Sequence, residues 1–254
     1  MKKIFTILLF SLGLSLTGLG QVLEQAFEQG NEQYAKGSYK AAASSYQKVV
    51  NAGYYSSDLY YNLGNAYYKQ QQYAKAILSY ERALKYAPSN SKIKNNLEMA
   101  KMHTRDKIEA VPAFFLTEWG LAIRNIFSAN GWAWMSVVAF VLCGLFFLVY
   151  RFLGSLLVKK VTFTLSSLFL LVFFFSVWNA SVKTEELKNP NAAIIMAPSA
   201  VVKSSPDQNG KDLFVLHDGA KVTFTSTLPV SGWREVRIAD GKVGWVESNT
   251  FEVI

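Results

Sequence analysis

The fold is decided by residues 59–88, which read LYYNLGNAYYKQQQYAKAILSYERALKYAP. Residues 61–84 repeat much of residues 27–50 at an offset of 34 positions. The identical pairs are Gly30 and Gly64, Asn31 and Asn65, Tyr34 and Tyr68, Tyr39 and Tyr73, Ala42 and Ala76, Ser45 and Ser79, and Tyr46 and Tyr80. A sequence period of this length is typical of stacked helical hairpins. Residues 27–84 are therefore expected to form a helical repeat.

The second copy carries a recognisable pattern of small and aromatic residues. Its members are Tyr60, Leu63, Gly64, Tyr67, Ala76, Tyr80, Ala83 and Pro88. This pattern resembles the tetratricopeptide repeat (TPR). The small residues allow two helices to cross closely, and the proline, which lacks an N–H, ends the second helix. We expect residues 21–107 to form a TPR module of two repeats, closed by a capping helix from residue 91.

The first helices of TPR hairpins line a concave groove that binds extended peptides. The predicted protein-binding residues are Phe27, Asn31, Tyr34, Tyr61, Asn62, Asn65, Tyr68, Lys92 and Asn95, with Met99 beside them. Asparagine amides can bond a peptide backbone, and tyrosines give rigid contact area. The alternative interpretation is that these side chains only cover the groove.

TPRs that bind a C-terminal carboxylate carry Lys, Asn, Asn, Lys and Arg at five groove positions. This chain is similar at Asn31, Asn62 and Lys92, but has Phe27 and Asn96 at the other two. Because two cations are missing, the resemblance does not predict a carboxylate ligand.

Three apolar segments indicate export and membrane anchoring. Residues 1–20 have Lys2 and Lys3 before a short apolar run, which is typical of a signal peptide; an uncleaved signal anchor is the alternative. Residues 132–150 and 161–180 are uncharged and long enough to be transmembrane helices. The resulting prediction is a multi-pass protein of the bacterial inner (cytoplasmic) membrane.

The connector at residues 151–160 contains three cations and no anion, which places it in the cytoplasm by the positive-inside rule. Both flanking modules then face the periplasm. The juxtamembrane segment at residues 108–131 has apolar residues at helical spacing. It is either an interfacial amphipathic helix or an extension of the first span.

After a polar linker at residues 181–192, residues 193–254 change to short β-rich runs separated by turns. The runs are 194–196, 201–204, 213–216, 222–226, 233–238 and 243–246. Gly232-Trp233, Asp240-Gly241 and Gly244-Trp245-Val246 resemble a bacterial SH3-like domain, which implies a small all-β barrel. Trp233 and Trp245 could form its ligand surface, for a peptide or for peptidoglycan, or could both belong to its core.

Composition and motifs exclude several other functions. The chain is 51% hydrophobic and only 17% charged, and its net charge of +8 is not gathered on one folded module, so we expect no nucleic-acid partner. No nucleotide-binding, hydrolase or metalloprotease motif is present, and the single cysteine and two histidines lie far apart. We therefore predict no enzyme, no catalytic residues, no cofactor and no metal.

The order of these modules resembles the BatE-type proteins of the Bat aerotolerance operon family. The strings that carry the resemblance are residues 96–101 (NLEMAK), 115–119 (FLTEW), 202–206 (VKSSP) and 212–217 (DLFVLH). The resemblance implies partners with von Willebrand A-type domains and a MoxR-type ATPase system, in stress or oxygen tolerance. The predicted function is an envelope scaffold that binds proteins beside the lipid bilayer. A transmembrane sensor or signalling adaptor is the alternative.

Overall fold

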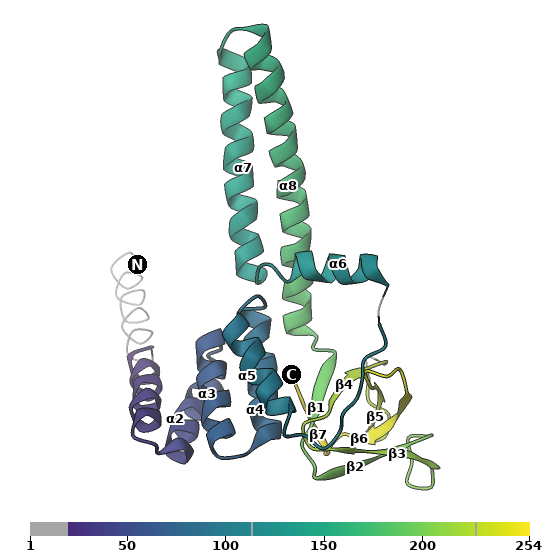
Figure 1. Ribbon diagram of the computed structural model, residues 1–254. Coiled ribbons are helices and arrows are strands. Elements are labelled where there is room, and N and C mark those ends of the chain that lie inside the picture. The colour runs from purple at the N-terminus through teal and green to yellow at the C-terminus, as the bar shows by residue number, and fades with distance from the viewer. Residues whose placement is uncertain (1–19, 113, 227) are drawn as a thin grey trace, which may run out of the picture. The chain divides into compact units, whose positions relative to one another are not determined.

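The computed structural model describes residues 20–112, 114–226 and 228–254. Apart from Gly20, the predicted signal peptide lies outside these residues. The described residues form two compact units (Figure 1). One unit contains the repeat helices and the C-terminal strands, and the other contains α6, α7 and α8. The predicted fold class is confirmed in its three parts: helical repeats, two long apolar helices and a C-terminal all-β region.

The repeat helices follow the predicted hairpins. Residues 20–35 form the first helix. The others are α2 (Tyr39–Asn51), α3 (Ser57–Lys69), α4 (Tyr73–Tyr86) and the capping helix α5 (Ser91–Lys101). The Ser56 side chain accepts a hydrogen bond from the Leu59 backbone N–H at the start of α3, and Asn90 caps α5 in the same way.

Each of the two hairpins contains one glycine at which its helices are in direct contact. A Cβ on Gly30 would lie 2.5 Å from the Tyr46 ring, and a Cβ on Gly64 would lie 2.6 Å from the Tyr80 ring. Both tyrosines are buried between the helices. The repeated Gly–Tyr pair is therefore a packing requirement, because any side chain larger than hydrogen would push the helices apart.

The second unit is built around a helical hairpin of α7 (Ala129–Phe152) and α8 (Leu156–Lys188). Both helices extend beyond the predicted spans, and α8 includes most of the segment predicted as a polar linker. Helix α6 (Phe115–Arg124) is separate from α7, since Ser128 caps the start of α7. Helix α7 enters the predicted juxtamembrane segment by only three residues, from Ala129, and α6 is not a continuous extension of it.

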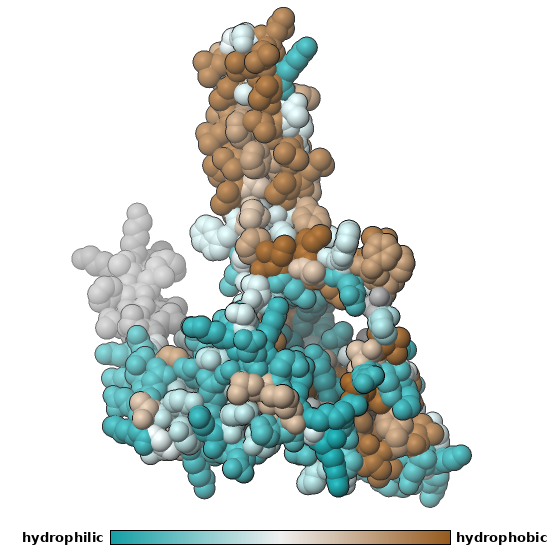
Figure 2. Space-filling model, in the orientation of Figure 1, coloured by the Kyte–Doolittle hydropathy of each residue, from teal (hydrophilic) through white to brown (hydrophobic). Residues whose placement is uncertain are grey.

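Most of the buried side chains of the hairpin are small or polar, and many of its large apolar side chains face outward. Ser166 Oγ donates to the Cys143 carbonyl oxygen across the hairpin at 3.1 Å. Phe140, Leu145 and Phe147 are each more than half exposed. Figure 2 shows hydrophobic surface along most of the hairpin. Both helices are long and apolar enough to cross a membrane.

The C-terminal region is an antiparallel sheet of seven strands. They are β1 (Ala192–Ile195), β2 (Ser199–Lys203), β3 (Asp212–His217), β4 (Lys221–Phe224), β5 (Trp233–Arg237), β6 (Val243–Glu247) and β7 (Phe251–Val253). All six predicted runs are strands, and the three-residue β7 was missed. The strand order is β3-β2-β6-β5-β4-β1-β7.

The sheet is not closed, in contrast to the barrel that the SH3-like resemblance implies. Strands β3 and β7 are the two edge strands of the sheet and do not pair with each other. Strand β2 pairs with β6 at one position, Lys203 with Trp245. One side of the sheet encloses a core that includes Val202, Val222 and Val236, all fully buried.

Within the first unit, the sheet contacts the repeats through charged groups. Arg82 on α4 donates to Glu252 Oε1 at 2.9 Å and to the Val253 carbonyl oxygen, and Lys221 donates to Glu81 at 2.7 Å. Asp106, which follows α5, accepts the His217 backbone N–H at 2.7 Å. These contacts connect β7 and the ends of β3 and β4 to the helical part.

Candidate functional site

A tyrosine and two asparagines form a hydrogen-bonded set in the first repeat. Tyr46 Oη donates to Asn31 Oδ1 at 2.8 Å, and Asn62 Nδ2 donates to the same oxygen at 3.1 Å. Tyr46 comes from the second helix of its hairpin, whereas Asn31 and Asn62 come from the first helices of consecutive hairpins. The set therefore links neighbouring repeats.

The same set recurs in the second repeat. Tyr80 Oη donates to Asn65 Oδ1 at 2.8 Å, and Asn96 Nδ2 donates to that oxygen at 2.8 Å. Asn96 Nδ2 also lies 3.3 Å from Tyr61 Oη. The repeated geometry fixes how each amide is oriented, because the Oδ1 atom of the central asparagine accepts two hydrogen bonds.

These bonds leave part of each amide available. Among the described residues, no partner is found for Asn65 Nδ2 or for the Oδ1 atoms of Asn62 and Asn96. All three side chains are partly exposed. The site therefore presents one amide donor and two amide acceptors, which is the chemistry that pairs with a peptide backbone.

These asparagines line two adjoining hollows. A hollow of about 240 Å³ is lined by Asn31, Tyr34, Tyr46, Asn62 and Asn65. A second, of about 160 Å³, is lined by Tyr34, Asn65, Tyr68, Lys69, Tyr80, Asn96 and Met99. Because Tyr34 and Asn65 line both, the hollows form one continuous surface. We call the residues of these two hollows the asparagine groove.

The asparagine groove is almost uncharged. Burial raises the pKa of the Tyr46 phenol to about 12, and burial also raises the pKa of Tyr80 and of Tyr34. The phenols therefore stay protonated at neutral pH and act as hydrogen-bond donors. Lys69 is the one charged residue that lines either hollow.

Five of the nine residues predicted for the TPR groove line these hollows, namely Asn31, Tyr34, Asn62, Asn65 and Tyr68. Tyr61 lies beside them through its contact with Asn96. Lys92 and Asn95 are exposed on α5 and line neither hollow.

Asn96 lines the second hollow. In the sequence analysis it stood at a carboxylate-clamp position but was not among the predicted protein-binding residues. Its signal was a spacing of 31 residues from Asn65, which matches the spacing from Asn31 to Asn62.

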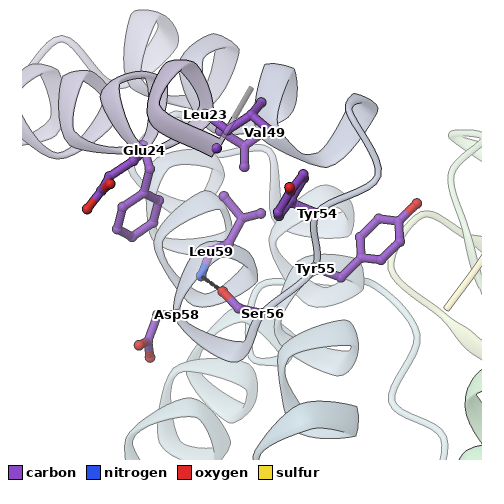
Figure 3. A pocket seen from close by; sticks show the side chains of 10 residues that line it. Leu23, Glu24, Val49, Tyr54, Tyr55, Ser56, Asp58 and Leu59 are labelled. Atoms are coloured by element: carbon purple, nitrogen blue, oxygen red, sulfur yellow. Dashed lines mark hydrogen bonds between the residues drawn. The ribbon is translucent and has the colours of Figure 1, made fainter. Parts of the chain in front are cut away.

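Phe27 lines a different pocket, at the N-terminal end of the repeats. Figure 3 shows this pocket with Leu23, Val49 and Leu59 among its lining side chains. This end pocket has a volume of about 350 Å³. Its lining residues are Gly20, Leu23, Glu24, Phe27, Val49, Tyr54, Tyr55, Ser56, Asp58 and Leu59. Its walls are mainly apolar, with two carboxylates, Glu24 and Asp58, among the lining side chains. A hydrophobic side chain of a partner would fit it better than a polar backbone would.

The two tryptophans predicted as a ligand surface lie in different environments. Trp233 on β5 is only 6% exposed. Trp245 on β6 is half-buried, and its cross-strand neighbours are Lys203 and Glu235. On β2 and β3, Val201 pairs with Val215, and both are exposed. Trp245 therefore has accessible surface for a ligand, and Trp233 has almost none.

In the part of the chain that the structure describes, no group of three or more His, Cys, Asp or Glu side chains is placed to hold a metal ion. Asp106 Oδ1 lies 2.7 Å from His217 Nδ1, but the same carboxylate also accepts the His217 backbone N–H. This pair therefore connects α5 to the end of β3 and is not aimed into either hollow.

A comparison with family models identifies the repeat directly. The tetratricopeptide repeat model matches residues 57–90, which contain α3 and α4. No curated protein matches the chain. The matched segment supplies Asn62, Asn65, Tyr68 and Tyr80 of the asparagine groove. Residues 57–90 are a tetratricopeptide repeat, a fold used for interaction between proteins.

Proposed function

We propose that the protein is a membrane-anchored scaffold whose asparagine groove binds an extended segment of a partner protein. The observation that carries this proposal is the repeated Tyr–Asn–Asn set, which holds amide groups in fixed orientation with unpaired atoms at a half-exposed surface. If the asparagines only stabilised the repeats, the hydrogen bonds between the tyrosines and asparagines would be sufficient. The amide atoms along the groove that have no partner among the described residues would then have no role.

The ligand chemistry follows from the charge of the groove. Neutral amides and the half-buried Tyr34 phenol suit the alternating N–H and C=O groups of an extended peptide. The Tyr46 and Tyr80 hydroxyls are buried and already donate to asparagines of the groove. A terminal carboxylate would need a cluster of cations, and the two hollows offer Lys69 alone. We therefore favour an internal, extended segment over a free C-terminus.

Membrane anchoring is supported by the exposed apolar surface of the α7–α8 hairpin. At 1.5 Å per residue, the 24 residues of α7 extend about 36 Å, against about 30 Å for the hydrocarbon core of a bilayer. Arg151, Lys159 and Lys160 at the bend favour a cytoplasmic position for it. In this proposal the repeats and the sheet face the periplasm of a bacterial inner membrane.

The C-terminal sheet gives the scaffold a second candidate surface, around Trp245. Trp245, Val201 and Val215 are accessible, and an accessible aromatic ring suits a peptide or the sugar rings of peptidoglycan. The resemblance to BatE-type proteins supports partners with von Willebrand A-type domains and a MoxR-type ATPase system, within a Bat-type complex linked to stress or oxygen tolerance.

A transmembrane sensor is the alternative function. Helices α7 and α8 are joined by only three residues, Leu153–Ser155, so the bend offers little surface to a cytoplasmic partner. A sensor would also need a second membrane protein to receive the signal. The short bend favours the scaffold.

The test uses a photo-cross-linking amino acid at Tyr34, which lines both hollows. Asn65→Asp keeps an oxygen that accepts from Tyr80 and Asn96 but removes the Nδ2 donor. Asn51→Asp is the matched control, because Asn51 lies outside the groove and accepts one bond from Gln47. We expect adducts with partner proteins that are lost in Asn65→Asp and kept in Asn51→Asp. Equal adduct formation in both variants would remove the groove from the proposal.

A further inference from the structure

Helix α6 carries a continuous apolar face that no part of its own unit covers. Phe115, Leu116, Trp119 and Ile123 lie at positions i, i+1, i+4 and i+8, which places them on one side of a helix. Their exposed fractions range from 45% to 66%, and α6 contains no buried residue. Thr117 and Arg124 lie on the opposite side. Such a face needs an apolar environment.

The C-terminal end of α6 is fixed to the base of the hairpin. Trp132 Nε1 of α7 donates to the Arg124 carbonyl oxygen at 3.0 Å, and Lys183 Nζ of α8 donates to Asn125 Oδ1 at 2.6 Å. The Arg124 guanidinium pairs with Glu186 at 3.5 Å and lies 5.7 Å from the Trp178 ring. These contacts connect α6 to residues 178–186 of α8.

That part of α8 is the place where its apolar sequence ends. No charged residue occurs between Lys160 and Lys183, and Trp178 lies close to the end of this stretch. Tryptophan, arginine and lysine at the end of an apolar span mark the boundary between hydrocarbon and water. The contacts of Arg124 and Asn125 therefore place the end of α6 at the level of this boundary.

The direction of α6 follows from the turn that precedes α7. Residues 125–128 separate the two helices, and within this unit α6 runs across the hairpin axis instead of along it (Figure 1). A helix at the boundary level that runs across the spans lies in the plane of the membrane surface. Figure 2 shows hydrophobic atoms over α6 as well as over the hairpin.

We propose that α6 is an in-plane helix whose apolar face, formed by Phe115, Leu116, Trp119 and Ile123, inserts among the acyl chains of the leaflet beside the base of the hairpin. The occupant of this face is lipid, because the end of α6 is fixed at the level where the apolar span of α8 ends, and the hairpin beside it exposes apolar side chains. This inference rests on the membrane anchoring in the proposed function. It gives the segment that leads from the repeats into α7 a second attachment to the bilayer.

The experiment measures the depth of spin labels on the full chain in nanodiscs of phosphatidylcholine and phosphatidylglycerol. Cys143→Ser removes the one cysteine of the sequence. Single labels are then placed through Trp119→Cys and Ile123→Cys on the apolar face and through Thr117→Cys on the polar face. Phe147→Cys in α7 serves as the reference inside the bilayer, and Lys211→Cys as the reference in water.

The expected result is that labels at positions 119 and 123 collide more with oxygen than with a water-soluble nickel complex, as the label at 147 does. The label at 117 should show the reverse preference. Preference for nickel at 119 and 123 would show a water-exposed helix, and low collision with both reagents would show a protein-covered one; either overturns the inference. If position 147 also prefers nickel, the anchoring itself fails, so the two failures are distinguishable.

Discussion

Replacing Gly64 by alanine should weaken the second repeat through one identifiable contact. The new Cβ would lie 2.6 Å and 2.7 Å from Cε1 and Cδ1 of the Tyr80 ring. That ring is 1% exposed, and its hydroxyl is bonded to Asn65, so it cannot turn away without losing buried contacts. Overpacking of this kind costs about 1–3 kcal/mol, and contact with two ring atoms places Gly64 near the upper value. Alanine recovers about 1 kcal/mol through its helix propensity. The expected net loss is about 2 kcal/mol.

Hydrogen–deuterium exchange of the full chain in nanodiscs measures this loss of stability separately in each helix. A single melting temperature would instead combine the stabilities of the two units. A loss of about 2 kcal/mol corresponds to roughly 30-fold faster exchange of the protected amides in α3 and α4. Gly120→Ala is the control, because a Cβ there meets no atom within 4 Å. Tyr80→Leu combined with Gly64→Ala should cost less than the sum of the single variants. Unchanged or slower exchange in Gly64→Ala would refute the crossing argument.

Three further predictions test other parts of the first unit. Because burial raises the pKa of Tyr46 from 10.0 to about 12, the folded repeats retain a proton that the unfolded chain loses. Their stability is therefore complete below pH 10 and falls between pH 10 and 12; urea unfolding followed by circular dichroism should show this fall, and Tyr46→Phe should reduce it. Trp233→Ala should destabilise the sheet by about 3 kcal/mol because Trp233 is buried. Trp245→Ala should change the free energy of opening that hydrogen exchange measures in β5 and β6 by less than about 1 kcal/mol. Asp106→Ala should cost the end of β3 about 1–2 kcal/mol, seen as faster exchange of the His217 amide, because it removes both bonds to His217; unchanged exchange there would contradict this contact.

The repeats were predictable because their pattern is local and periodic. Gly64 and Tyr80 recur 34 residues after Gly30 and Tyr46, and each pair meets inside one hairpin, so the spacing alone indicates the contact. The position of Asn96 was harder to predict. Its partner Asn65 lies on another helix, and the choice between Asn95 and Asn96 depends on the rotation of α5 about its axis. A change of one residue turns a helix position by about 100°.

The sheet shows where sequence patterns leave a choice open. Side chains alternate across a strand, so a run such as Gly244-Trp245-Val246 fits either face until the register is known. The structure buries Val246, and this turns Trp245 outward. A Cβ on Gly244 would lie 2.5 Å from Val202 Cγ1, so the glycine lets β2 and β6 approach closely. Closure of the barrel depends on the pairing of β3 and β7, which local patterns do not encode.

The contacts between the repeats and the sheet affect how the proposed scaffold could work. Arg82 reaches β7, Asp106 reaches the end of β3, and Ile108 packs against the sheet core. The Val111 backbone N–H donates to the Ala239 carbonyl oxygen at 3.0 Å, so the chain leaving α5 follows the sheet and is not a free linker. A flexible linker would let two bound partners move independently. In a single compact unit, a partner in the asparagine groove and another at Trp245 would be held at a fixed separation. Binding at one surface would then increase the affinity of the other surface only for linked partners whose own geometry matches that separation.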